Sequence, residues 1–73
     1  MKVYPVVQSV KWEDSRLLDV YGDSEDAIER AREEAGSNRL NKEVHEWRDA
    51  SETHVFSART GDVTFVVTER EVL

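Results

Sequence analysis

The absence of cysteine is the feature that most constrains how this chain of 73 residues can fold. Many domains of this size rely on disulfides or on a thiolate-bound zinc ion, because a short chain buries little apolar surface. Both devices are excluded here, together with thiolate catalysis and iron–sulfur clusters. Burial of apolar residues must hold the fold together, and the length predicts a single domain covering residues 1–73.

The charge balance is acidic, with 16 Asp and Glu against 10 Lys and Arg and a formal net charge of −6. Binding to the phosphate backbone requires clustered Lys and Arg, so we expect no direct contact with nucleic acid. No apolar run is long enough to cross a bilayer, and residues 1–20 lack the apolar segment of a secretory signal. We therefore expect a cytoplasmic protein with no membrane partner. The preference for Arg over Lys and for Val over Ile favours a high-GC or halophilic genome.

The N-terminal segment has the pattern of a β-hairpin. Alternating apolar residues over 2–12 and 16–21 flank the turn residues 13–15. Because Pro5 lacks an N–H group, we expect it at a sheet edge or at the start of its strand. If the strands pair directly across the turn, one face of the hairpin forms the core. That face would contain Tyr4, Val6, Val10, Trp12, Leu18 and Val20.

A helix is predicted next, over residues 24–35. Asp23 is a good N-cap residue, and acidic residues in the following turn suit the positive end of a helix. Gly36 stands where a C′ glycine is expected. The apolar residues that recur at helical spacing are small, which allows the helix to lie close against a sheet. They are Ala27, Ile28, Ala31 and Ala35.

Residues 37–52 admit two interpretations. Leu40, Val44 and Trp47 recur at the spacing of a short helix. The alternative is a strand over 43–48 followed by a turn and a further strand.

The C-terminal segment favours the strand interpretation. Strands over 53–58 and 63–70 are predicted on either side of a turn at Gly61, which can adopt a positive φ. The registers across this turn and the preceding one agree on a single apolar face. The order is then ββαβββ, or ββααββ if residues 38–48 are helical. Either order is a small α+β domain, with one helix packed across an antiparallel sheet of four to five strands. The shared face would contain Trp47, Phe56, Ala58, Val63, Phe65 and Val67, with His45 and His54 among them.

One helix covers only one face of a sheet, and the opposite face is also predicted to carry apolar side chains. A contiguous apolar patch on a small acidic domain is typical of a contact surface for a partner protein or a second copy. Exposed valines also occur on strands simply because of their β-propensity. The predicted interface residues are Val7, Leu17, Tyr21, Val55 and Val66.

The exposed side of the helix offers a second candidate surface. Asp26, Arg30 and Glu34 alternate in sign at i, i+4 spacing, which supports the helix itself. A neighbouring stripe of like charge suits a partner with a basic surface, although a solvated helix face explains the same residues. This acidic stripe consists of Glu25, Glu29 and Glu33.

No catalytic or metal-binding motif is present. His45 and His54 lie nine positions apart and do not fit H-E-x-x-H. No G-x-S-x-G elbow occurs, and the predicted register points His54 and Ser57 to opposite faces. The glycines stand alone and form no phosphate-binding loop. We therefore expect no enzyme activity, no metal and no cofactor.

Residues 1–35 resemble very small proteins of unknown function encoded by phages, prophages and haloarchaeal genomes. The resemblance rests on K-V-Y at 2–4, D-V-Y-G at 19–22 and D-S-E-D-A at 23–27. It implies no catalytic residues and favours an inhibitor of a host defence protein, anti-CRISPR proteins being one such type. The leading hypothesis is a non-enzymatic protein-binding module that acts by surface occlusion or acidic mimicry. The alternative is a structural homodimer from a halophilic or high-GC organism.

Overall fold

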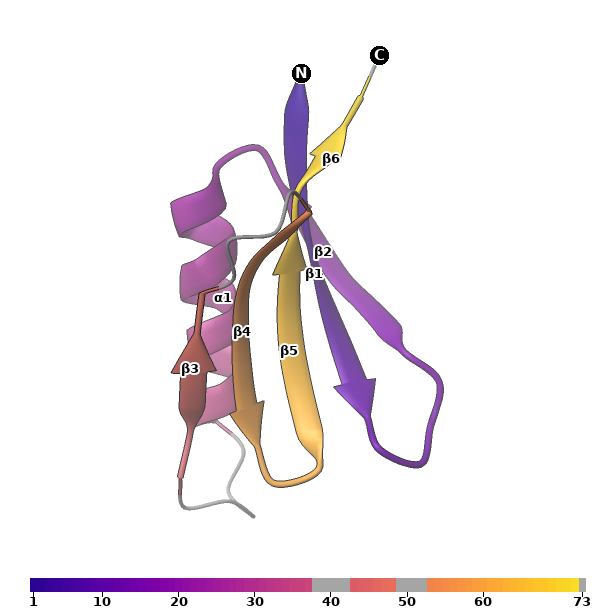
Figure 1. Ribbon diagram of the computed structural model, residues 1–73, viewed down its shortest axis with the longest axis vertical. Helices are drawn as coiled ribbons and strands as arrows, with labels where there is room; N and C mark the ends of the chain where they lie inside the picture. Colours follow the sequence, from indigo (N-terminus) through magenta and orange to yellow (C-terminus); the bar gives the residue numbers. More distant parts are fainter. Residues whose placement is uncertain (38–42, 49–52, 73) are drawn as a thin grey trace.

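The structure is a computed structural model that describes residues 1–37, 43–48 and 53–72 (Figure 1). One helix packs against an antiparallel sheet with the strand order β2-β1-β5-β4-β3, and β6 pairs with the N-terminal end of β1. The predicted α+β class and the ββαβββ order are confirmed, with β6 as an additional short strand. The elements are β1 (Lys2–Val10), β2 (Arg16–Tyr21), α1 (Ser24–Gly36), β3 (His45–Trp47), β4 (His54–Thr60), β5 (Val63–Thr68) and β6 (Arg70–Glu71).

The helical alternative for the middle segment is wrong over His45–Trp47, which forms a strand. Val44 lies before this strand without regular structure, and Leu40 falls outside the described residues. The expected strand over 43–48 is thus shorter than predicted.

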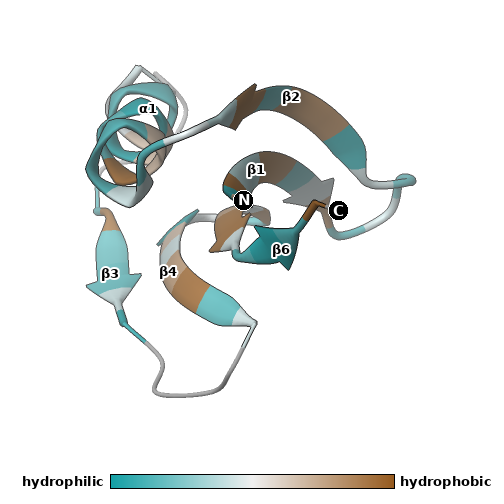
Figure 2. Cartoon of the chain, turned by 90° about the horizontal axis from the view of Figure 1, so that it is seen from above, coloured by the Kyte–Doolittle hydropathy of each residue, from teal (hydrophilic) through white to brown (hydrophobic). Residues whose placement is uncertain are grey.

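The sheet curves round the helix, so that α1 lies on its concave side (Figure 2). α1 contacts β5, β4, β1 and β2. The core between them is mainly apolar, and the predicted helix stripe of Ala27, Ile28, Ala31 and Ala35 is buried as expected. Small helix residues allow the close approach, and larger side chains of the sheet fill the remaining space. The buried sheet residues are Val6, Phe56, Ala58, Phe65 and Val67.

Side-chain hydrogen bonds cap both ends of the helix. Asp23 is the N-cap, as predicted, and its Oδ1 accepts a hydrogen bond of 2.8 Å from the Glu25 N–H. At the other end Gly36 is the last helical residue, so its prediction as C′ is wrong. Ser37 ends the helix instead, because its N–H and Oγ both donate to the Glu33 carbonyl, at 3.0 and 2.7 Å.

β1 is a central strand, and the prediction that Pro5 lies at an edge is wrong. Pro5 pairs with Val20 of β2, while the ladder to β5 starts only at Val6. On the same side of β1, the ladder to β6 reaches no further than Val3. The break between β5 and β6 thus falls beside Pro5, which explains how a residue without an N–H fits a central strand.

The predicted register of the first hairpin is wrong. Pairing starts at Gln8 and Arg16 rather than at Trp12, so a longer loop joins the strands. Trp12 lies in that loop and is 81% exposed instead of contributing to the core. The register then shifts at a β-bulge in β2, between the pairs Val7–Leu17 and Val6–Asp19.

The apolar residues Phe56, Ala58, Val63, Phe65 and Val67 of the C-terminal hairpin share one face as predicted, but the register is two residues away from the predicted pairing of Phe56 with Phe65. Thr60 pairs with Val63 across a two-residue turn, where Gly61 has a φ of 60°. Phe56 therefore faces Val67. A second β-bulge, between His54 and Phe56, lies in β4.

The pairing of β3 with β4 differs from the predicted pairing of Trp47 with His54 by three residues, which is an odd number. Trp47 pairs with Ser57 and Glu46 with Ala58. Because neighbouring residues of a strand point to opposite faces, Glu46 takes the helix side that was predicted for His45 and Trp47.

Candidate functional site

The sheet face that α1 leaves uncovered, here called the outer face, is the candidate functional surface. Cross-strand pairs place one side chain from each of five strands in a single row on this face. The row runs from one edge of the sheet to the other, through Trp47, Ser57, Val66, Val7 and Leu17.

Three large apolar side chains of the outer face are accessible. Leu17 is 58% exposed, Val20 is 47% exposed and Trp47 is 43% exposed. Val7 and Val66, between them in the sheet, are half-buried. A small acidic domain that leaves apolar side chains on one face has a surface suited to contact with another protein.

The two bulges decide which residues belong to this face. A β-bulge places two residues opposite one, which reverses the alternation of the strand beyond it. The bulge in β2 sends Val20 to the outer face and turns Tyr21 towards the core, where Tyr21 packs beside Leu18. The bulge in β4 directs Val55 to the core as well.

The predicted interface residues are therefore only partly brought together. Val7, Leu17 and Val66 lie side by side on the outer face, whereas Tyr21 and Val55 do not belong to it. Sequence reasoning missed Val20 and Trp47. No local signal marks them, because their orientation depends on the bulge and on the β3–β4 register. The prediction that Val20 belongs to the core is wrong for the same reason.

His54 and Ser57 lie on the same side of the sheet, against the prediction. The bulge between them brings His54 Nε2 into hydrogen-bonding contact with Ser57 Oγ. Ser57 is fully buried, so a substrate cannot reach its hydroxyl group. Among the described residues, no group of three or more His, Asp or Glu side chains is arranged to hold a metal ion.

The acidic stripe lies on the exposed side of α1, away from the outer face. Glu25, Glu29 and Glu33 are all exposed. The Arg48 guanidinium is 3.9 Å from the Glu25 carboxylate, a weak surface contact. Within the described parts of the chain, the carboxylates of Glu29 and Glu33 form no ion pair, so their charge faces solvent.

Arg30 forms the predicted i, i+4 pair with Glu34 but, among the described residues, none with Asp26, and it also ties α1 to β2. Its Nε donates to Glu34 at 2.9 Å and its Nη1 donates to Tyr21 Oη at 3.2 Å. The same guanidinium is 3.6 Å from the Asp19 carboxylate. Hydrogen bonds to Tyr21 and Glu34 raise the pKa of Arg30, so this cation stays charged and anchors the β2 margin to the helix.

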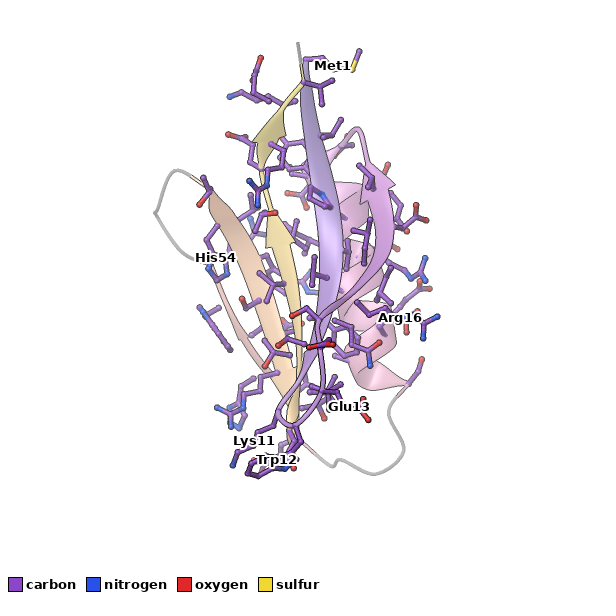
Figure 3. The ribbon with its side chains drawn as sticks, turned by 90° about the vertical axis from the view of Figure 1, so that its right-hand side faces the viewer. Met1, Lys11, Trp12, Glu13, Arg16 and His54 are labelled. Carbon is purple, nitrogen blue, oxygen red and sulfur yellow. The ribbon has the colours of Figure 1, made fainter. Side chains whose placement is uncertain are left out.

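The β1–β2 loop forms one end of the molecule, opposite Met1 (Figure 3). The Lys11 ammonium lies 5.0 Å from the centre of the exposed Trp12 ring, and the Lys11 N–H donates to the Asp62 carbonyl at 3.0 Å. This contact joins the two loops at that end. An open hollow beside them is lined by Lys11, Trp12, Glu13 and Asp14.

Comparison of the chain with protein-family models, curated proteins and solved structures finds no match. Within the described residues, no helix has the length and hydropathy needed to span a membrane.

Proposed function

We propose that this protein is a non-enzymatic protein-binding domain that holds a partner against its outer face. The observation that carries the proposal is the row of side chains across five strands, with Leu17 and Trp47 exposed at its two ends. A partner that covers this row removes large apolar side chains from water. Burial of each such side chain contributes about 1.5–3 kcal/mol to association before the entropic costs are subtracted.

The rigidity of the outer face supports the same function. Val7 and Val66 belong to the two central strands, whose other face packs on the helix. A surface built on paired strands loses little conformational entropy on binding. The resemblance of residues 1–35 to small phage and haloarchaeal proteins favours a host protein as the partner, inhibited by occlusion of its surface.

The acidic stripe supports a second candidate function, mimicry of an acidic ligand. Glu29 and Glu33 are exposed and unpaired within the described residues, so they attract a basic surface. The stripe and the outer face lie on opposite sides of the domain. A single flat partner surface therefore contacts one of them and not the other.

Capture of a partner by the immobilised domain, at low and high salt, distinguishes the two functions. Binding through the outer face should persist at high salt and weaken about tenfold or more in Leu17→Asp. Binding through the stripe should fall as ionic strength rises, because the Debye length is already about 8 Å at physiological salt. In that case Glu29→Lys should abolish capture and Leu17→Asp should not. If the same partner is captured equally by both variants, both surfaces are wrongly assigned.

A further inference from the structure

β2 is an open edge of the sheet. Among the described residues it pairs only with β1, and Figure 1 shows no strand beyond it. β2 has six residues, whereas β3 at the opposite edge has three. A long edge strand presents backbone N–H and C=O groups that can pair with another strand.

The side chains of β2 point to the two faces in a palindromic order. The pairs with β1 and the contacts with the core place Leu17 and Val20 on the outer face, and the other four residues on the helix side. With 'in' for the helix side and 'out' for the outer face, the order from Arg16 to Tyr21 is in, out, in, in, out, in. This order arises from the bulge, since a regular strand of six residues would alternate.

We propose that β2 pairs with β2 of a second copy of this chain, in antiparallel orientation about a twofold axis. Only a partner with the same palindromic pattern keeps every side chain on its own face along the whole strand. The axis would pass between Leu18 and Asp19. Leu17 would then face Val20 of the second copy, and the reverse pair would form by symmetry.

The charges of β2 complement each other in this arrangement. Arg16 is exposed and forms no ion pair within the described residues. On the helix side of the joint sheet, Arg16 would lie diagonal to Asp19 of the second copy, within reach of a long side chain. In the single chain, Asp19 Oδ1 accepts a hydrogen bond of 2.8 Å from the Val20 N–H. Pairing of the Val20 N–H with the second copy frees Oδ1 for Arg16 of that copy, while Oδ2 stays 3.6 Å from the Arg30 guanidinium.

The outer faces of the two copies would merge. The Leu17 and Val20 pairs continue the row that already contains Val7 and Val66. The apolar outer faces of the two copies would form one surface across both sheets, and the exposed apolar side chains of β2 would be partly covered.

Sedimentation equilibrium of the purified chain, from micromolar to millimolar concentration, tests the proposal without any partner protein. The wild type should show a monomer–dimer equilibrium. Arg16→Glu and Leu17→Asp should each raise the dissociation constant about tenfold or more, because symmetry applies each change twice. Trp47→Ala is the matched control: it lies in β3, at the far edge, and should leave the equilibrium unchanged.

A second measurement locates the contact directly. A mixture of labelled and unlabelled chains should give an intermolecular NOE between Leu17 of one copy and Val20 of the other. A chain that stays monomeric at the highest concentration overturns the proposal. So does a dimer that Trp47→Ala weakens while Arg16→Glu leaves it intact, since that result indicates packing of outer faces rather than of β2 edges.

Discussion

Replacement of Ala31 by Leu tests how closely the helix packs against the sheet. Ala31 has no exposed surface and lies in the middle of the buried stripe of α1. Leu is nearly as good a helix former as Ala, so the substitution barely changes the intrinsic stability of the helix. The additional carbons must push the helix away from the sheet. Overpacking of this kind costs about 1–3 kcal/mol.

A loss of this size is a large fraction of the total. A domain of 73 residues has a free energy of unfolding of about 4–11 kcal/mol. For a domain of this length, a loss of about 2 kcal/mol lowers Tm by about 8–16 °C. The urea midpoint should fall by about 1–2 M, since the denaturant slope of a small domain is about 1–2 kcal/mol/M.

Urea unfolding followed by far-UV circular dichroism measures the effect, at a concentration low enough that self-association does not contribute. Glu29→Leu is the control, because Glu29 is exposed on the same helix and the new residue is the same. Its effect should stay within about 0.5 kcal/mol. An unchanged midpoint for Ala31→Leu would refute the close packing. Equal losses in both variants would assign the effect to the helix rather than to its contact with the sheet.

Three further changes probe local features of the fold. Asp23→Ala removes the N-cap and should lower the free energy of unfolding by about 1 kcal/mol in urea titrations, whereas an effect near zero would mean that the cap is dispensable. Gly61→Ala places a side chain at a φ of 60° and should cost about 1–2 kcal/mol by thermal unfolding. The control Gly22→Ala, whose added methyl group meets nothing within 4 Å, should cost less, and equal effects would contradict the explanation from φ. Burial and a hydrogen bond to Glu69 raise the pKa of Tyr4 above its ordinary value of 10.0, so its contribution to stability is present below pH 10.0 and is lost as pH rises through the raised pKa. Tyr4→Phe should therefore show a smaller decrease of Tm at alkaline pH, and parallel curves for the two proteins would exclude this contribution.

The helix was predictable because its signals are local. Asp23 before an acidic turn and the stripe of small apolar residues are both read from a few consecutive positions. Only the end was misplaced by one residue. The hydroxyl and N–H of Ser37 compete successfully for the Glu33 carbonyl, and Gly36 keeps a helical conformation.

The strands were predictable but their registers were not. Alternation in the sequence assumes that each residue faces one partner, and the bulges at Leu18 and Val55 break that assumption. A tight first turn was also assumed, whereas the loop around Trp12 is longer. Of the five predicted interface residues, Val7, Leu17 and Val66 therefore share the outer face, whereas Tyr21 and Val55 point to the core.

The prediction against nucleophilic catalysis by His54 and Ser57 depended on the same registers. The predicted register places the His54 and Ser57 side chains on opposite faces of the sheet, whereas the two side chains are in contact in the structure. Ser57 is fully buried, so its hydroxyl group is sealed from solvent, and this burial is a property of packing that no motif encodes.

The pairing of β1 with β5 has a consequence for the order of folding. Val6 and Val67 are adjacent in the centre of the sheet, although nearly the whole chain separates them. During synthesis, β1 leaves the ribosome long before its neighbour is translated, and the β1–β2 hairpin alone is at best marginally stable. The core can close only when β5 has emerged. A topology with many such distant contacts is expected to fold more slowly than a helical bundle of the same length.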